Sequence, residues 1–376
     1  MDAPPGEDSS EPFLSAARDT VYLSWLERSG PDEHELRMAA LTGAGWGSPM
    51  VVEASERFFV NWADFPSVTP AADGSLWAHW LERGENGGYG VRVSRSADGG
   101  ASWSGPWTPH DDESATDHGF VATVPVEGLR GFVWLDGRAF APVDASYAET
   151  ALYFRSFDAD GPTGPERPID PRVCDCCQTD AATTELGPIL AYRDRSPDEI
   201  RDIHVTRWVE GAWSAPRLVH EDRWQTSSCP VNGPAVDAAG TRVAVAWFTA
   251  ANGVPRVKIA FSEDAAQSFG EPTIVDDGDP SGRVDVVLLD DGAALVSWLE
   301  RTGGDFAEVR VRYVAPDGSA TPSTSVSAST TERVRGFPRM ALVSSGRVIV
   351  AWTDVGGLLP RVRVATVDVS MSEARP

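Results

Sequence analysis

The sequence predicts an all-β protein, a β-propeller built from four-stranded antiparallel blades. Seven short apolar runs recur through the 376 residues, each ending in an aromatic side chain, and successive aromatics lie 51 to 58 residues apart. A period near 50 residues made of short strands is typical of propellers. The 35 glycines and 28 prolines fit a chain with many turns. We therefore favour seven blades, with six as the alternative.

Each repeat begins with a strand pattern that leads into its aromatic residue. The seven aromatic residues are Trp25, Trp80, Trp134, Tyr192, Trp247, Trp298 and Trp352. A second strand follows after a loop, at residues 91–94, 203–206, 257–260, 309–312 and 361–365. A Gly-rich turn then leads to a further strand. The last repeat lacks an obvious final strand, so we expect either that N-terminal residues complete this blade or that it stays short.

Composition and charge restrict the setting and the partners. Residues 1–10 are polar and linker-like, and we expect residues 11–376 to form a single propeller domain. We interpret Met1 as the replacement of an export leader, and expect a periplasmic or extracellular monomer. No stretch reaches the ~20 apolar residues of a membrane helix. The net charge of −24 argues against nucleic acid and anionic membranes as partners, because their phosphates would be repelled.

One turn carries a recognisable motif. Residues 96–103, Ser-Ala-Asp-Gly-Gly-Ala-Ser-Trp, fit the pattern S-x-D-x-G-x-x-W, and residues 262–269 form a degenerate copy. Together with the repeat, this motif resembles the Asp-box of sialidase-like (BNR-repeat) propellers. The resemblance implies that the box caps the turn between the third and fourth strands of a blade. A short acid there satisfies turn amides, and glycine permits a positive φ.

The catalytic residues of sialidases do not accompany this resemblance. Sialidases of the family use three arginines that hold a carboxylate, a Tyr–Glu nucleophile pair and an Asp acid. Their first-blade Arg-Ile-Pro motif is missing here, where residues 11–15 read Glu-Pro-Phe-Leu-Ser. None of the six tyrosines has the expected setting late in the chain at the start of an inner strand. The resemblance therefore implies the architecture and not the catalytic set.

The four cysteines are the main candidate site. Cys174, Cys176 and Cys177 lie in one run, and Cys229 follows at a distance. The inner strand of each blade precedes the aromatic residue and starts at one mouth of the central channel. Counting fifteen residues back from the aromatic of the fourth repeat gives Cys177, and Cys229 precedes the inner strand of the fifth repeat. We therefore expect all four thiols to cluster at that mouth.

Three interpretations of the cysteines stay open. The first is two structural disulfides, which the even count and export favour. The second is a soft-metal centre, with copper(I) as the first choice and zinc as the alternative. The candidate metal ligands are Cys174, Cys176, Cys177, Cys229 and His118. The third is a redox or nucleophilic thiol whose pKa Arg193 and Arg335 could lower.

Several acidic residues are candidates for acid–base chemistry. The Trp-Leu-Glu-Arg sequence at residues 25–28, 80–83 and 298–301 recurs in three blades, which indicates a structural role because a catalytic group is usually unique. Asp64, Asp180 and Asp202 are single and near the mouth, and are therefore better candidates.

The leading hypothesis is an exported propeller with a copper site at the channel mouth and a small-molecule or glycan ligand. Whether this site makes the protein a metal-dependent redox enzyme is left open. The alternatives are a glycan-active or glycan-binding protein of the sialidase type, and a structural or interaction propeller stapled by disulfides.

Overall fold

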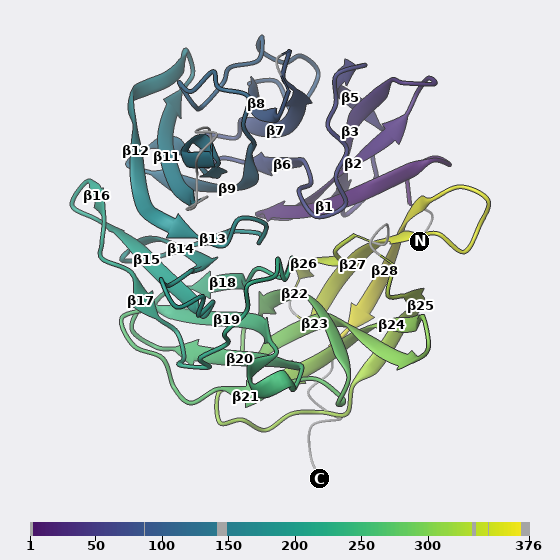
Figure 1. Ribbon diagram of the computed structural model, residues 1–376. Coiled ribbons are helices and arrows are strands. Elements are labelled where there is room, and N and C mark those ends of the chain that lie inside the picture. The colour runs from purple at the N-terminus through teal and green to yellow at the C-terminus, as the bar shows by residue number, and fades with distance from the viewer. Residues whose placement is uncertain (1–2, 86, 141–148, 333–335, 345, 370–376) are drawn as a thin grey trace. The chain divides into compact units, whose positions relative to one another are not determined.

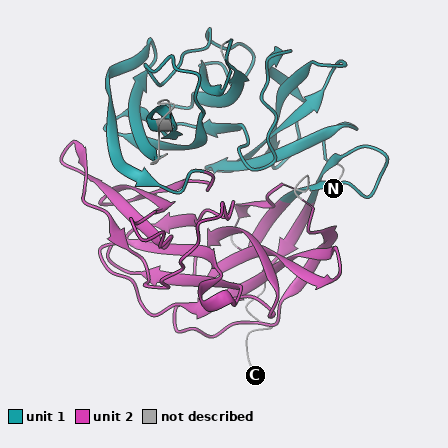
Figure 2. Cartoon of the chain, in the orientation of Figure 1, with its two compact units in different colours: residues 1–175, 351–364 teal, residues 176–350, 365–376 magenta. Residues whose placement is uncertain are grey.

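The predicted fold class is confirmed. The computed structural model describes residues 3–85, 87–140, 149–332, 336–344 and 346–369. Within these ranges the chain forms seven antiparallel sheets, the blades of a seven-bladed β-propeller, together with the short 3-10 helices η1 (Arg138–Phe140) and η2 (Ala251–Gly253). Figure 1 labels the strands of these sheets. Contacts divide the chain into two compact units, residues 1–175 with 351–364 and residues 176–350 with 365–376 (Figure 2).

Unit 1 contains three complete sheets, in each of which consecutive strands pair antiparallel. The first consists of β1 (Ser9–Ala17), β2 (Thr20–Arg28) and β3 (His34–Thr42), with β4 (Gly45–Trp46) and β5 (Met50–Ser55) both paired to β3. The second consists of β6 (Ser67–Pro70), β7 (Leu76–Arg83) and β8 (Tyr89–Ser96). The third consists of β9 (His118–Val126), β10 (Leu129–Asp136), β11 (Thr150–Asp158) and β12 (Gly161–Val173).

Unit 2 contains three further sheets of the same kind. The first consists of β13 (Asp180–Thr184), β14 (Gly187–Arg193) and β15 (Ile203–Val209), with β16 (Ala212–Trp213) and β17 (Arg217–Leu218) both paired to β15. The second consists of β18 (Ala235–Ala239), β19 (Arg242–Thr249), β20 (Arg256–Ser262) and β21 (Thr273–Ile274). The third consists of β22 (Pro280–Leu288), β23 (Ala294–Gly303), β24 (Phe306–Val314) and β25 (Thr324–Thr330).

The last sheet has three strands within the described residues, so the shorter of the two expected forms is observed. It consists of β26 (Arg339–Ser344), β27 (Arg347–Asp354) and β28 (Arg361–Asp368). The N-terminal segment touches this blade without adding a strand. The Ser9 amide donates to the Pro360 carbonyl at 3.1 Å, and the Val362 amide donates to the Ser9 hydroxyl at 3.0 Å.

The aromatic residues of the repeat occupy the second strand of each sheet. Five of the tryptophans are less than 2% exposed, so each buried indole N–H needs an acceptor. In four strands the acid two residues later accepts it, because residues i and i+2 share a face of a strand. These pairs are Trp25–Glu27 at 3.0 Å, Trp80–Glu82 at 3.1 Å, Trp134–Asp136 at 2.8 Å and Trp298–Glu300 at 2.6 Å. The acids of the Trp-Leu-Glu-Arg repeats therefore have the structural role that their recurrence indicates.

The two segments that resemble the Asp-box form matching turns after β8 and β20. Asp98 accepts the amide and hydroxyl of Ser102 at 2.9 and 2.6 Å, and Asp264 accepts those of Ser268 at 2.8 and 2.6 Å. The first turn places Gly99 and Gly100 at positive φ, whereas the second places Ala265 and Ala266 there, at φ of 57° and 62°. A residue other than glycine in this left-handed region destabilises the fold by about 1 kcal/mol. The hydrogen bonds of Asp264 therefore stabilise a backbone conformation that the two alanines disfavour.

We expect Glu300→Ala to lower the free energy of unfolding by about 1–3 kcal/mol, because it leaves the buried indole N–H of Trp298 without its acceptor. Glu300 also accepts the amide of Asp279 at 2.8 Å. Urea titration followed by circular dichroism measures the change. The control is Glu308→Ala, which removes the acid of the half-exposed Glu308–Arg310 ion pair and should cost less than about 1 kcal/mol. Equal losses in both variants would contradict the assigned role of Glu300.

Candidate functional site

The cysteines lie in the loops that lead into two inner strands. Cys174, Cys176 and Cys177 follow β12 directly, and β13 begins three residues after Cys177. Cys229 lies in the segment before β18, which begins six residues later. The count from the aromatic residues therefore locates the strand starts to within a few residues. The thiols themselves lie in the connecting loops and not inside the strands.

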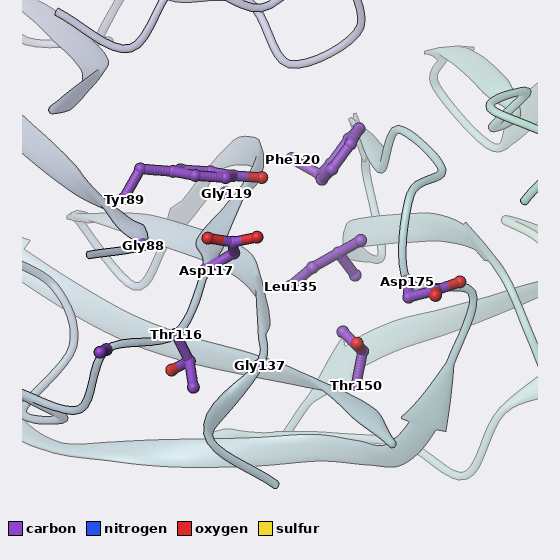
Figure 3. A pocket seen from close by; sticks show the side chains of 11 residues that line it. Gly88, Tyr89, Thr116, Asp117, Gly119, Phe120, Leu135, Gly137, Thr150 and Asp175 are labelled. Atoms are coloured by element: carbon purple, nitrogen blue, oxygen red, sulfur yellow. The ribbon is translucent and has the colours of Figure 1, made fainter. Parts of the chain in front are cut away.

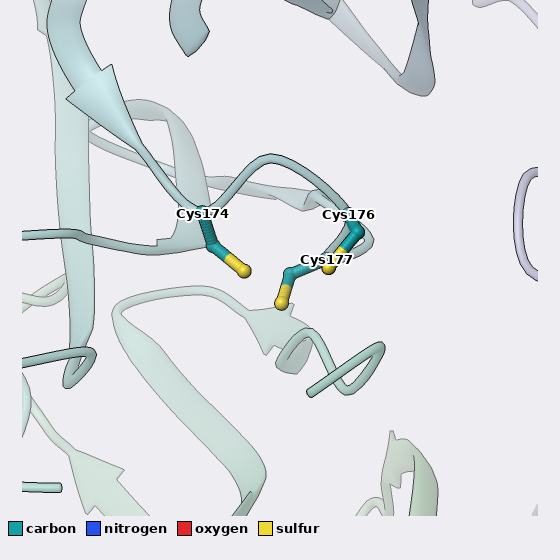
Figure 4. A group of neighbouring side chains, drawn as sticks. All are labelled: Cys174, Cys176 and Cys177. Carbon is teal, nitrogen blue, oxygen red and sulfur yellow. The ribbon is translucent and has the colours of Figure 1, made fainter. Parts of the chain in front are cut away.

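All four cysteines form disulfides. Cys176 is bonded to Cys229 across a sequence separation of 53, with Cα atoms 6.1 Å apart. Cys174 and Cys177 are also disulfide-bonded and therefore pair with each other by elimination. Figure 4 shows the sulfurs of the Cys174–Cys177 segment turned toward a common point. Of the three possible pairings, the observed one avoids a bond between the adjacent residues Cys176 and Cys177.

The same sulfurs are close enough to hold a metal ion once they are reduced. The donor atoms of Cys174, Cys176 and Cys177 lie within 4.8 Å of one another, and so do those of Asp175, Cys176 and Cys229. Their exposure differs. Cys174 and Cys177 are 1% and 2% exposed, whereas Cys176 is half-buried and Cys229 is exposed. A reductant in solution therefore reaches the Cys176–Cys229 bond before it reaches the buried one.

His118 belongs to neither of these groups. It is buried in β9, and its Nε2 atom lies 3.1 Å from a carboxylate oxygen of Asp112 and 3.5 Å from one of Asp136. Its ring stacks on that of His110 with centroids 4.0 Å apart. These acids and the neighbouring ring fix the orientation of the imidazole within unit 1.

Asp64 lies three residues before β6, and Asp180 is the first residue of β13. Each accepts a backbone amide from the inner strand of the next blade. The amide of Phe120 donates to Asp64 at 2.7 Å, and the amide of Val236 donates to Asp180 at 2.8 Å. Asp64 is buried and Asp180 is half-buried, and desolvation raises the pKa of each to about 7. The same link recurs in unit 2, where Asp237 accepts the amide of Leu288 at 2.8 Å and Asp285 accepts that of Met340 at 2.6 Å. Because the same carboxyl-to-amide hydrogen bond recurs in four places, we infer that these acids join the inner strands of neighbouring blades.

Arg193 and Asp202 also bind backbone groups. The buried guanidinium of Arg193 donates to the carbonyls of Asn232, Arg201 and Phe248 at 2.8, 2.5 and 2.6 Å. Burial lowers the pKa of Arg193 to about 9. Asp202 accepts the amides of Arg223 and Trp224 at 2.8 and 3.0 Å. Arg193 thus directs its hydrogen bonds to three carbonyls. Arg335, the other arginine predicted to act on a thiol, lies outside the described residues.

A cavity in unit 1 borders the cysteine segment. Its volume is about 520 Å³, and its lining includes Tyr89, Asp117 and Asp175, which lies between Cys174 and Cys176 in the chain (Figure 3). Asp117 can be found from the sequence pattern, because it directly precedes the inner strand β9 of its blade. No sequence pattern singles out Tyr89, which begins the third strand of its own blade. A contact between separate blades is needed to bring these two residues together.

Comparisons with known proteins support the fold. No protein-family model matches the chain, and no curated protein matches it. A solved protein of unknown function from Dyadobacter fermentans aligns with a TM-score of 0.56 and 16% identity, over 97% of this chain and 95% of that one. The leech intramolecular trans-sialidase aligns with a TM-score of 0.52 and 10% identity, over 94% and 83%. The polysaccharide lyase Uly1 aligns with a TM-score of 0.51 and 10% identity, over 96% and 90%.

Identities this low carry the architecture and no activity. A sialidase and another carbohydrate-active enzyme thus share the propeller fold of this chain, which fits the resemblance seen in the sequence. Among the described residues, no helix has the length and apolar character needed to cross a membrane.

The raised pKa of Asp180 makes stability depend on pH. The ordinary pKa is 3.8, and burial raises it to about 7 in the folded protein. The folded state therefore keeps a proton that the unfolded chain has lost. The stability from this group is complete below pH 3.8, decreases as the pH rises above that value, and is fully lost once the pH has passed about 7. We expect the unfolding free energy of Asp180→Asn to fall less between pH 5 and pH 8 than that of the unchanged protein. The difference should be on the order of 1 kcal/mol or more.

Chemical denaturation at the two pH values measures this slope. Asp317→Asn serves as the control, because Asp317 is exposed and hydrogen bonds from Ser319 lower its pKa. That variant should keep the original slope. An unchanged slope in Asp180→Asn would show that Asp180 is already ionised at pH 5.

Proposed function

We propose that the chain is an exported propeller whose Cys176 and Cys229 thiolates bind copper(I) after their disulfide is reduced. The observation that carries the proposal is the position of these two sulfurs. They come from separate loops, they already meet in a bond, and they are the accessible pair of the cluster. A carboxylate oxygen of Asp175 lies within 4.8 Å of both sulfurs. Two thiolates held in place by a rigid scaffold are a suitable pair of ligands for a soft monovalent ion.

The accessible pair favours copper over zinc. Copper(I) is soft and accepts thiolate ligands in low coordination numbers. Structural zinc sites are closed by four ligands in a tetrahedron, and here the third and fourth sulfurs belong to a buried disulfide. Zinc would therefore require both bonds to open. Copper requires one, and a single ion can then bind at Cys176 and Cys229.

The loading step needs a reductant. Opening the Cys176–Cys229 bond takes up two electrons and two protons from a dithiol donor, which is itself oxidised to a disulfide. Copper(I) then displaces the two thiol protons, and copper is neither oxidised nor reduced in binding. Reoxidation of the pair would release the ion, so copper affinity would follow the redox state of the surroundings. A catalytic redox role would act on a small molecule bound beside the cluster.

Export is consistent with the cysteine chemistry. Disulfides form and persist in the periplasm and outside cells, and are rare in the cytosol. Every cysteine of the chain is in a disulfide. If the sulfurs serve as a structural staple and never open, the protein is instead a stapled binding scaffold, and the experiment below separates these two functions.

We expect the protein, after mild reduction that frees two thiols, to bind about one copper(I) ion per chain. The thiols are counted by alkylation mass spectrometry and the copper by elemental analysis after anaerobic gel filtration. Cys229→Ser should abolish this uptake, because one thiolate remains. The matched control is the double variant Cys174→Ser, Cys177→Ser, which keeps the accessible pair and should still bind one ion. Equal copper in the Cys229→Ser variant would contradict Cys229 as a ligand, and no copper in the reduced protein would favour the stapled scaffold.

We expect no hydrolysis of a fluorogenic sialoside above background. A sialoside carries a carboxylate, and the cavity beside the cysteine segment has no Lys, Arg or His among its described lining residues. Two of those residues are acids, and they would repel the substrate. Turnover that survives repurification and is lost in Asp117→Asn would contradict this expectation.

A further inference from the structure

The cavity of unit 1 combines aromatic, hydroxyl and acidic side chains. Its described lining consists of Gly88, Tyr89, Ala115, Thr116, Asp117, Gly119, Phe120, Leu135, Gly137, Thr150 and Asp175. In Figure 3, Tyr89 and Asp117 lie near each other, and Asp175 and Thr150 lie on the other side of the space. A volume of about 520 Å³ lies within the range of small-molecule sites.

Tyr89 is held rigidly at the cavity wall. One face of its ring stacks on Phe59, with centroids 4.0 Å apart and planes inclined by 13°. Its backbone bridges to that of Asp117, so the phenol and the carboxylate keep a fixed relation. Burial, together with the charges of Asp64 and Asp117, raises the pKa of Tyr89. The phenol therefore stays neutral and keeps its proton.

A third acid lies behind this wall. Asp64 is 2% exposed. The amide of Phe120 donates to it at 2.7 Å, and the side chain of Tyr89 donates a hydrogen bond that partly offsets the effect of burial on its pKa. A Cβ atom at Gly119 would lie 2.0 Å from the Oδ2 atom of Asp64 and 2.8 Å from the Tyr89 ring. Glycine at position 119 thus lets the carboxyl group approach the cavity lining. This carboxyl group therefore lies next to two of the residues that line the cavity, Tyr89 and Gly119.

We propose that this cavity binds a small organic cation, an amine or a guanidinium compound. Asp117 offers a carboxylate at the wall, and the rigid ring of Tyr89 offers a face that attracts cations. Two acids, Asp117 and Asp175, line the cavity, and its described lining has no basic side chain. The net charge of −24 adds a long-range field that concentrates cations at the surface. A chelated metal ion is disfavoured, because the metal-binding groups found among the described residues contain neither Asp64 nor Asp117.

Proton release accompanies this binding. Burial raises the pKa of Asp64 to about 7, and partial desolvation raises the pKa of Asp117. A bound cation favours the ionised form of both acids and expels their protons. Affinity for an amine should therefore increase as the pH rises from 5 to 8. The titratable groups that face the two acids are Tyr89 and His118, and the two acids also face each other.

The inference does not depend on the proposed copper site. Its test uses the oxidised protein, in which the cysteines are closed, so a failure here leaves the copper proposal untouched. Likewise, a protein that never binds copper can still bind an amine. Asp175 connects the two regions, because it lines the cavity and lies between Cys174 and Cys176 in the chain.

Calorimetric titration of the full chain with benzylamine, benzyl alcohol and benzoate tests the charge preference. The three probes share one ring and differ in charge. We expect benzylamine to bind at pH 8 with a Kd at or below about 1 mM, the alcohol to bind at least about tenfold more weakly, and benzoate not to bind. The benzylamine affinity should fall at pH 5, and its binding heat at pH 7 should vary with the ionisation enthalpy of the buffer.

Variants of the wall locate the binding site. Asp117→Asn should weaken benzylamine binding about tenfold or more, whereas Asp317→Asn, which changes the net charge equally at an exposed acid, should not. Tyr89→Ala should also weaken binding, while Tyr89→Phe keeps the ring and should retain most of it. Circular dichroism confirms that each variant is folded. The proposal is overturned if the alcohol binds as tightly as the amine, if benzylamine does not bind, or if Asp117→Asn binds it unchanged.

Discussion

The fold of this molecule depends on hydrogen-bond partners for the polar groups that are buried within its sheets. A tryptophan in the second strand fills the space between sheets, but its indole N–H cannot reach water. The acid two residues after the tryptophan lies on the same strand face and accepts this hydrogen bond. This holds for Trp25, Trp80, Trp134 and Trp298. Where the strand supplies no acid, another segment does, as Asp222 accepts the indole of Trp247 at 2.7 Å. Five of the six tryptophans of the repeat meet this requirement, in two ways, whereas the indole N–H of Trp352 finds no hydrogen-bond acceptor among the described residues.

The same requirement explains why so many acids in this chain have no catalytic freedom. Asp64, Asp180, Asp237 and Asp285 each bind the amide of another first strand, and Arg193 binds three carbonyls. A carboxylate that holds a backbone amide keeps a fixed position between two strands, which gives it a structural task of its own. Chemistry is left to groups that the scaffold does not use. The sulfurs of the cysteine loops and the acid–tyrosine wall of the cavity are such groups.

The fold follows from local patterns, whereas the site depends on contacts between blades. The spacing of the tryptophans predicts seven blades because each blade repeats the same local packing problem. The fifteen-residue count finds the inner strands since strand and turn lengths vary little between repeats. The disulfide pairing could not be predicted in this way, because four cysteines allow three pairings and the sequence alone does not distinguish among them. Tyr89 meets Asp117 from a separate blade, and no periodicity within one blade encodes that meeting.

Asp175 belongs to both proposed sites, because it lines the cavity and lies between Cys174 and Cys176 in the chain. The Cys174–Cys177 bond closes a ring of four residues around it, and the Cys176–Cys229 bond ties that ring to a loop 53 residues away. Closing a loop of that length constrains the unfolded chain by about 4 kcal/mol in the entropy model. Opening the accessible bond removes that constraint while the buried bond still holds the ring. The backbone of Asp175 would then keep its turn but lose its outer tether. We therefore expect thiol chemistry at Cys176 and ligand binding beside Asp175 to influence each other, and by linkage any such effect is reciprocal.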